Sequence, residues 1–298
     1  MIMDKHAYLI IAHSNLEQLH KLLLLLDDPR NDIYIHLDLK SKLDIKKITP
    51  PHMKYSHCKF CERVNVGWGN VSQIQTEFNL FELATQVEHS YYHLISGIDL
   101  PLHSQDYIHR YFNGKNFEYI GYSPSWNVRE RVYCHNLFLG KLRYPNRYVR
   151  GGFQKLRQIY NKFQILLGYR RKQPKYEFQA GCNWVSVTHD FVLSLLEKKD
   201  EILKMYQYAY CPDEIYKQTF AYNSEFRNRI YNVTDEFEGC LREIDWKRGR
   251  PYIWRKEDYD YLSHSNRLFA RKFDENVDEE IINMLINKIN LKSATYRV

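Results

Sequence analysis

Two hydrophobic periodicities alternate along the first hundred residues of the chain. Short runs of consecutive apolar residues, typical of buried strands, are separated by stretches in which apolar side chains recur every three to four residues, as on one face of a helix. Ser14 and Glu17 complete a Ser-Asn-Leu-Glu capping box, which predicts the start of the first helix. The predicted strands are 7–12, 32–37 and 91–96, and the predicted helices are 14–26 and 71–87.

Strands that are separated by helices form a parallel sheet through right-handed crossovers. We therefore predict an α/β fold with a central, mostly parallel sheet flanked by helices. The alternation resumes after residue 176 without a repeat or a low-complexity linker, so a single domain over 1–298 is the simplest organisation. The later predicted strands are 182–187 and 241–246, and the later predicted helices are 190–197, 212–220 and 277–289.

Ligands of such sheets bind beyond the carboxyl ends of the strands. This rule selects His13, Asp38 and the Ser-Gly-Ile-Asp turn ending at Asp99 as neighbours of a site. No Gly-x-Gly-x-x-Gly follows the first strand, and the sequence contains no Walker loop. The pattern therefore argues against a dinucleotide dehydrogenase and a phosphate-loop NTPase. It predicts a nucleotide site without a glycine cradle.

The signals for targeting and membrane insertion bear on where in the cell the protein is expected. The N-terminus runs directly into an apolar strand without a secretory signal, and the longest aliphatic run, residues 22–26, is far too short to span a bilayer. Six cysteines in a chain without a signal are expected to be reduced thiols. We therefore expect a cytoplasmic protein that is either soluble or peripheral on the inner membrane face.

The net charge of +7 is concentrated in one segment. Residues 131–176 contain twelve Lys and Arg and no Asp or Glu, and between 153 and 167 apolar residues recur at helical spacing among the cations. A basic amphipathic helix of this kind can lie on an anionic membrane surface, or it can pack its apolar side on its own core; the sequence favours neither. No nucleic-acid-binding motif accompanies the segment, so we expect no nucleic-acid partner.

Two short segments carry candidate chemistry. Cys211-Pro-Asp-Glu214 has proline and acids at a predicted helix start, which the helix dipole alone would explain. Residues 268–274, Leu-Phe-Ala-Arg-Lys-Phe-Asp, set two cations between aromatic residues just before the final helix. These cations suit either a surface salt bridge to Asp274 or a fixed positive charge that meets a phosphate.

Taken together, seven segments resemble the core-2/I-branching β-1,6-N-acetylglucosaminyltransferase family, which includes peptide O-xylosyltransferases. They occur in the family's order along most of the chain. The segments are Tyr-Leu-Ile-Ile-Ala-His at 8–13, Ile-Tyr-Ile-His-Leu-Asp at 33–38, Val-Gly-Trp-Gly at 66–69, Leu-Ile-Ser-Gly-Ile-Asp-Leu-Pro-Leu at 94–102, Phe-Gln-Ala-Gly-Cys-Asn-Trp at 178–184, Cys-Pro-Asp-Glu at 211–214, and 268–274.

The resemblance implies a GT-A-type fold, with a nucleotide-sugar-binding half over 1–125 and an acceptor-binding and catalytic half over 126–298. It also implies an inverting transfer without a divalent metal or other cofactor. Glu214 matches the general base of the family, and Lys272 matches a lysine that acts with an upstream arginine on the donor diphosphate. The candidates for that arginine are Arg250, which we favour, and Arg248, Arg242 and Arg271.

The remaining residues that the resemblance implies are pocket-lining. His13, Asp38 and Trp68 match donor-side positions, and Asp99 is expected near the donor sugar or ribose. Trp184 and Asp213 are expected on the acceptor side. An Asp-x-Asp at 258–260, the usual metal-binding signature, lies in a polar segment late in the chain, so we do not assign it a metal.

The sequence thus predicts transfer of a sugar from a UDP-sugar to a hydroxyl of a glycan or a lipid-linked oligosaccharide. UDP-GlcNAc is the first expectation by family branch, with a β-linkage in a bacterial surface polysaccharide. UDP-xylose with an O-xylosyltransferase-like activity is the second. A non-catalytic module that binds anionic membrane or polymer through 131–176 is the third. A glycoside hydrolase needs two opposed carboxylates. Asp213 adjoins Glu214, but adjacent residues on one helix point in different directions, so we set this class aside.

Overall fold

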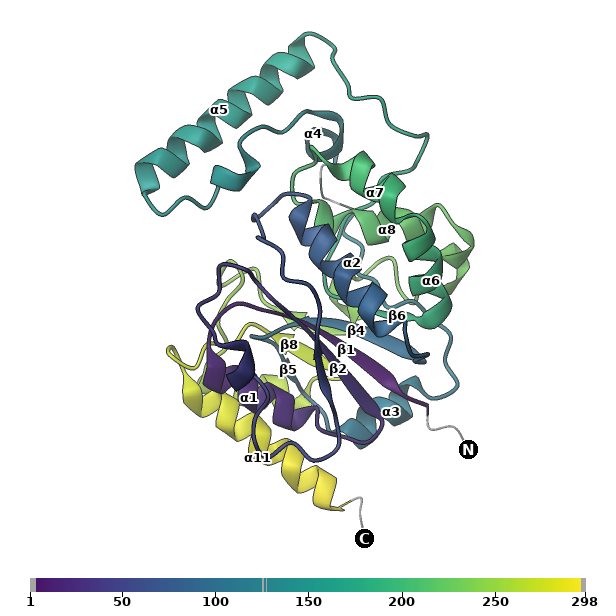
Figure 1. The fold of residues 1–298 in the computed structure, drawn as a ribbon, viewed down its shortest axis with the longest axis vertical. Helices are drawn as coiled ribbons and strands as arrows, with labels where there is room; N and C mark the ends of the chain where they lie inside the picture. Colours follow the sequence, from purple (N-terminus) through teal and green to yellow (C-terminus); the bar gives the residue numbers. More distant parts are fainter. Residues whose placement is uncertain (1–3, 125, 127, 296–298) are drawn as a thin grey trace.

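The computed structural model describes residues 4–124, 126 and 128–295. A five-stranded sheet with the order β3-β2-β1-β4-β6 forms its centre (Figure 1). The first four strands are parallel and β6 is antiparallel to β4, which confirms the predicted α/β fold with a mostly parallel sheet. The strands are β1 (His6–Ala12), β2 (Asn31–Leu37), β3 (Cys58–Phe60), β4 (Tyr91–Ser96) and β6 (Ser186–Thr188).

A second, three-stranded sheet has the order β5-β8-β7. Its strands are β5 (Leu100–Pro101), β7 (Arg242–Ile244) and β8 (Phe269–Arg271). β5 follows β4 after a short turn, and it pairs antiparallel with β8, which comes from near the C-terminus. The residues after β8 therefore lie beside the carboxyl end of β4.

Side chains on the central sheet alternate between two cores because successive residues of a strand point to opposite faces. In β1, Tyr8 and Ile10 face a core shared with α1, α3 and α11, whereas Ala7 and Leu9 face a core shared with α2, α6, α7 and α8 (Figure 1). These helices are α1 (Leu16–Leu25), α2 (Ser72–Ala84), α3 (Gln105–Phe112), α6 (His189–Glu197), α7 (Lys199–Tyr206), α8 (Tyr216–Tyr222) and α11 (Glu279–Thr295).

One long helix, α5 (Arg147–Leu166), stands away from both cores (Figure 1). It belongs to the basic segment and is joined to the body through the loops on either side. No helix within the described residues is both long enough and apolar enough to cross a bilayer. The remaining helices are α4 (Arg129–Tyr133), α9 (Glu236–Cys240) and α10 (Tyr259–His264).

Four predictions of local structure need correction. The capping box does not form: Asn15 occupies the cap in a left-handed conformation, and no side chain caps the helix. The strand predicted at 182–187 begins only at Ser186, and the Cys182 carbonyl accepts a hydrogen bond from the side chain of Gln218 instead of from a strand. The strand predicted at 241–246 is shorter and joins the second sheet.

The helix predicted at 212–220 is two helices. Pro212–Glu214 form a 3-10 turn, and α8 starts only after Ile215, whose φ of −130° and ψ of −42° break the helix. The Glu214 carbonyl cannot continue a regular helix because it accepts a hydrogen bond from the backbone N–H of Gly181. This break separates Glu214 from the helix that follows.

Candidate functional site

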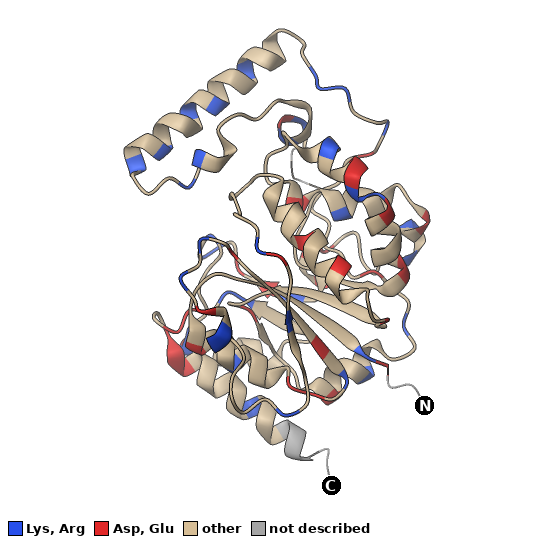
Figure 2. Ribbon diagram, in the orientation of Figure 1, with Lys and Arg blue, Asp and Glu red and all other residues tan. Residues whose placement is uncertain are grey.

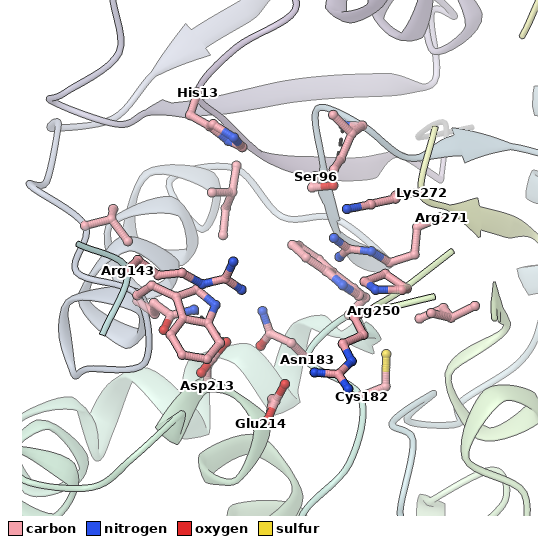
Figure 3. Close-up of a pocket in the computed structure, with 18 of the residues that line it drawn as sticks. His13, Ser96, Arg143, Cys182, Asn183, Asp213, Glu214, Arg250, Arg271 and Lys272 are labelled. Carbon is pink, nitrogen blue, oxygen red and sulfur yellow. Dashed lines mark hydrogen bonds between the residues drawn. The ribbon is translucent and has the colours of Figure 1, made fainter. Parts of the chain in front are cut away.

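A cleft of about 950 Å³ opens at the carboxyl ends of β1 and β4. Residues 11–14 and 96–98, which are the last residues of these strands and the turns after them, form one wall, as expected for a parallel sheet. Figure 3 shows Asp213 and Glu214 on one side of the cleft, with Arg271 and Lys272 on the other. Carboxylates and cations that are far apart in the sequence thus share one cavity.

The acidic side is built on a tight backbone turn. Cys211 has a positive φ of 45°, and its N–H donates to the carbonyl of Gly69 over 2.9 Å. The Glu214 carbonyl accepts from Gly181 over the same distance. A Cβ at Gly181 would lie 2.0 Å from the carbonyl oxygen of Gly121, so this close approach requires glycine. Three of the seven resembling segments therefore meet around Glu214.

Arg131 forms an ion pair with Glu214. Its guanidinium donates to Oε2 of Glu214 over 2.7 Å and to the carbonyl oxygens of Tyr210 and Cys211. Burial raises the pKa of Glu214 above its usual range, while Arg131, by charge and hydrogen bond, acts to lower it. The carboxylate is half-buried in the cleft, where it can accept a proton from a hydroxyl group.

Asp213 is a buried acid, unlike Glu214. Its Oδ2 accepts a hydrogen bond from Gln73 over 2.8 Å. Burial, with the nearby charges of Glu214 and Glu77, raises its pKa. The raised pKa of Asp213 disfavours a second negative charge beside Glu214.

A buried ion pair lies beneath the acidic turn. Lys217 and Glu77 are both fully buried and bonded to each other, and Tyr216 donates to the same Glu77 oxygen over 2.6 Å. Lys217 also donates to Oδ1 of Asn183 over 2.7 Å. Asn183 lines the cleft, so this network fixes the orientation of its amide.

The cationic side depends on β8. The Arg271 carbonyl accepts from the indole N–H of Trp254 over 2.8 Å, and the Lys272 carbonyl accepts from the Trp254 backbone over 3.0 Å. The next residue, Phe273, donates to the carbonyl of Ile98 over 2.9 Å. The backbone that carries the two cations is thereby attached to the turn after β4.

Arg250, Arg271 and Lys272 differ in their surroundings within the cleft. The Arg271 guanidinium lies 4.3 Å from the centre of the Trp184 ring, and its Nε is buried without a hydrogen-bond partner, 3.7 Å from Asp99. Burial and the charge of Arg271 lower the pKa of Lys272. In the described part of the chain no carboxylate forms an ion pair with Lys272 or Arg250. An anion that entered the cleft would therefore meet cations with uncompensated charge.

Other predicted residues lie at the cleft as well. His13, Trp68 and Trp184 line it, and Arg250 extends into it from the loop after β7 (Figure 3). The guanidinium of Arg143 lies 4.3 Å from the centre of the Trp68 ring. The donor or acceptor role of each of these residues stays a prediction.

Four predicted residues do not line the cleft. Arg242 is buried and donates to the carbonyl oxygens of Cys240 and Val185. Arg248 is exposed and is paired with Asp245 and Asp258. Arg242 is enclosed by the protein and Arg248 is paired with acids outside the cleft, so neither is available to a ligand in the cleft.

The other two predicted residues that do not line the cleft are acids, and both accept hydrogen bonds from the protein itself. Asp38 follows β2 and accepts from the backbone of Lys40. Asp99 is 1% exposed and accepts from the N–H and hydroxyl of Ser96 over 2.9 and 2.6 Å. Asp99 therefore organises the turn that carries Ser96 and lies close to Arg271, instead of facing the cleft.

The Asp-x-Asp segment is part of a different structure. Asp258 accepts hydrogen bonds from Arg248 and from the backbone N–H of Arg255, and neither Asp258 nor Asp260 lines the cleft. Within the described residues there is no group of three or more His, Cys, Asp or Glu side chains that could hold a metal ion.

The sequence did not identify several residues that the structure brings to the site. Arg131 was visible only as one of twelve cations in the basic segment. Glu77 lies within an ordinary helical pattern, and Asn183 was one letter of a resembling segment. Glu236 also lines the cleft, and burial raises the pKa of its carboxyl group. Membership of the basic segment was the only signal for Arg131, because its pairing with Glu214 forms only in the folded chain.

Comparison with known proteins is consistent with this arrangement. Residues 6–268 match the sequence model of the family described as Core-2/I-Branching enzyme. The chain is 22% identical to a xylosyltransferase of Ciona intestinalis over 307 residues, which cover 95% of this chain and 34% of that protein. It is 20% identical to a xylosyltransferase of Drosophila melanogaster over 290 residues, which cover 90% of this chain and 31% of that protein.

A human protein is similar over a larger share of its length. The chain is 20% identical to β-1,3-galactosyl-O-glycosyl-glycoprotein β-1,6-N-acetylglucosaminyltransferase 3 of Homo sapiens over 322 residues, which cover 96% of this chain and 68% of that protein. By contrast, the chain spans about a third of the length of the two xylosyltransferases.

Proposed function

The chain belongs to the Core-2/I-Branching enzyme family, and on that basis we propose that it is an inverting glycosyltransferase that uses a UDP-sugar without a divalent metal. One observation carries the proposal. Glu214 lies across a single cleft from Arg271 and Lys272 at the carboxyl end of the central sheet, and Arg250 lines the same cleft (Figure 3). The arrangement supplies a proton acceptor and an anion site within one cavity.

Glu214 would act as the general base. In an inverting transfer, the acceptor oxygen attacks the anomeric carbon from the side opposite the leaving group. The hydroxyl loses its proton as the new carbon–oxygen bond forms, so a carboxylate within hydrogen-bond reach lowers the barrier. Arg131 supports this role because it opposes the rise in the pKa of Glu214 that burial causes.

Lys272, with Arg250 and Arg271, would stabilise the leaving group. As the bond between the anomeric carbon and the β-phosphate oxygen breaks, its electron pair leaves with UDP, and negative charge grows on the β-phosphate. Cations fixed at that point stabilise this charge without moving during the reaction. Arginine adds a planar fork that can bind phosphate through two hydrogen bonds.

Two donor sugars follow from the relatives. UDP-GlcNAc is our first proposal, with transfer to a glycan hydroxyl to give a β-linkage, as in assembly of a bacterial surface polysaccharide. UDP-xylose is the second, and it is favoured by the similarity to the two xylosyltransferases.

The test is release of UDP from a panel of UDP-GlcNAc, UDP-xylose, UDP-galactose and UDP-glucose, in buffer that contains EDTA. We expect one donor to be turned over in EDTA at the rate seen with added Mg²⁺ or Mn²⁺. Glu214→Gln should reduce the rate by about 10²–10⁴-fold. Lys272→Met should reduce it by about 10²–10³-fold, the range for loss of one oxyanion donor.

Lys256→Met is the matched control, because Lys256 is exposed, pairs with Glu280 and lies outside the cleft. Its rate should equal that of the wild type. Activity that disappears in EDTA and returns with a metal would contradict the metal-independent mechanism. Nearly full activity in Glu214→Gln would show that another group takes the proton.

A further inference from the structure

The helix α5 is amphipathic, and its polar side faces the protein. Asn161 and Gln164 are its buried residues. Asn161 donates to the side-chain oxygen of Asn136 over 2.9 Å, and Gln164 exchanges hydrogen bonds with the backbone of His135 at 2.8 and 3.2 Å. These contacts fix which side of the helix meets the body. The prediction that α5 could pack its apolar side on its own core is therefore wrong.

The apolar side of α5 faces solvent. Leu156, Ile159 and Phe163 are 52%, 64% and 57% exposed, and Leu166 is 83% exposed. Positions separated by three and four residues lie on one face of a helix, so these side chains form a continuous stripe. From Leu156 to Leu166 the helix rises by about 15 Å. A contiguous apolar stripe of this length on an exposed surface indicates an interaction site.

The charges around the apolar stripe indicate the chemistry of the surface that would bind it. In Figure 2, α5 and the loops beside it carry only Lys and Arg among their charged positions. Lys155 and Lys162 flank the stripe and are exposed. Of the twelve cations between 131 and 176, only Arg131 forms an ion pair with a carboxylate in the described part of the chain. The surface that complements this combination is both apolar and anionic.

We propose that α5 binds the surface of an anionic lipid bilayer, with its apolar stripe in the acyl boundary and its lysines among the headgroups. Interfacial helices have this combination of a strong apolar face and flanking basic residues. A second copy of the chain would fit the apolar stripe but not the charge, because two α5 helices would bring like charges together. An anionic bilayer complements both the apolar stripe and the positive charge of α5.

Docking through α5 would bring the cleft to the membrane. Arg150 and Gln154 of α5 line the cleft, together with Leu142 and Arg143 from the loop before it. A glycan attached to a membrane lipid would therefore reach the cleft without leaving the bilayer surface. This consequence rests on the proposed function, whereas membrane binding itself does not.

The experiment is co-sedimentation of the whole protein with vesicles of phosphatidylcholine alone or mixed equally with phosphatidylglycerol, without any sugar donor. We expect binding to the mixed vesicles that weakens as salt rises from 0.05 to 0.5 M, because screening reduces the attraction. Ile159→Ser/Phe163→Ser should weaken binding at least tenfold. Lys155→Gln/Lys162→Gln should weaken it by about 25-fold, since each basic residue contributes about fivefold.

Matched controls change the same residue types elsewhere. Leu24→Ser/Leu193→Ser alters exposed apolar residues on α1 and α6, and Lys46→Gln/Lys47→Gln alters exposed lysines of the 3-10 helix Ile45–Lys47. These variants should bind as the wild type does. Each α5 variant should keep its melting temperature, because its changed side chains are exposed.

Two outcomes would overturn the proposal. One is no binding to the phosphatidylglycerol vesicles at low salt, or equal binding by wild type and Ile159→Ser/Phe163→Ser. The other is a dimer in light scattering that this double substitution dissociates, without vesicle binding, which would assign the stripe to a second copy. Because the binding assay uses no donor, its failure leaves the transferase proposal intact, and loss of UDP release leaves the membrane proposal intact.

Discussion

Removal of the guanidinium of Arg131 should shift the pH dependence of the reaction. Arg131 and Glu214 are 14% and 28% exposed, and their nearest atoms are 2.7 Å apart. Unit charges about 4 Å apart attract by about 4 kcal/mol at an effective dielectric constant of 20. Partial exposure screens this value, so we expect Arg131→Met to raise the pKa of Glu214 by about 1–2 units, or about 1.4–2.8 kcal/mol.

The direction of the effect follows from the role of the base. Glu214 must be a carboxylate to accept the proton, so activity is lost as pH falls through its pKa. A raised pKa moves the acid limb of the kcat/KM profile upward by the same 1–2 units. The variant should therefore lose about 10–100-fold at pH values below the limb and much less at alkaline pH.

The assay is UDP release from the donor that the panel identifies, measured from pH 5 to pH 9. Arg131→Lys keeps the charge and should restore most of the wild-type profile, whereas Glu214→Gln should abolish the acid limb. The affinity for UDP checks that the cleft remains folded. If Arg131→Met lowered kcat equally at every pH, Arg131 would only hold the backbone of residues 210 and 211, and the electrostatic reasoning would be refuted.

Three further predictions concern stability and can be checked by urea unfolding. Lys217→Met should destabilise the protein by about 3–5 kcal/mol because Glu77 is left buried and unpaired, and Glu77→Gln in the same chain should recover much of the loss; no recovery would contradict the pairing. Gly181→Ala should cost at least about 1–3 kcal/mol through the clash with Gly121, whereas Gly151→Ala, which has open space, should be tolerated or stabilising. Burial lowers the pKa of His109 to about 4, so the unfolded state binds protons first as pH falls below about 6.5. Stability should therefore decrease by about 2 kcal/mol between pH 7 and pH 5 on account of this residue, and His109→Gln should show a correspondingly smaller decrease.

Local patterns predicted the elements whose environment is simple. β1, β2 and β4 are buried on both faces, so each appears as a run of apolar residues, and the predicted ends agree with the structure within one residue. Segments that depend on remote partners were predicted poorly. Asn15 replaces the predicted cap because its side chain donates to Asp274, 259 residues away in the chain. No local pattern contains such a contact.

In the candidate site, too, the sequence predicts some features and tertiary contacts decide the others. The order of the resembling segments, with acid at 213–214 and cations at 271–272, is a property of the sequence, and it was sufficient to nominate both sides of the cleft. The sequence does not determine which arginine acts with Lys272, because Arg242, Arg248 and Arg250 have the same side chain within nine positions of one another. Packing separates the candidates: Arg242 is buried among carbonyl groups and Arg248 is paired with acids, whereas Arg250 and Arg271 line the cleft.

Amphipathicity by itself determined that a basic helix would form near 153–167, since periodicity depends only on the spacing of residues along the chain. The direction of its apolar face depends on partners for the opposite face, and these are Asn136, His135 and Tyr210 from other segments. Sequence determines which side chains share a face, whereas only tertiary contacts determine what that face meets.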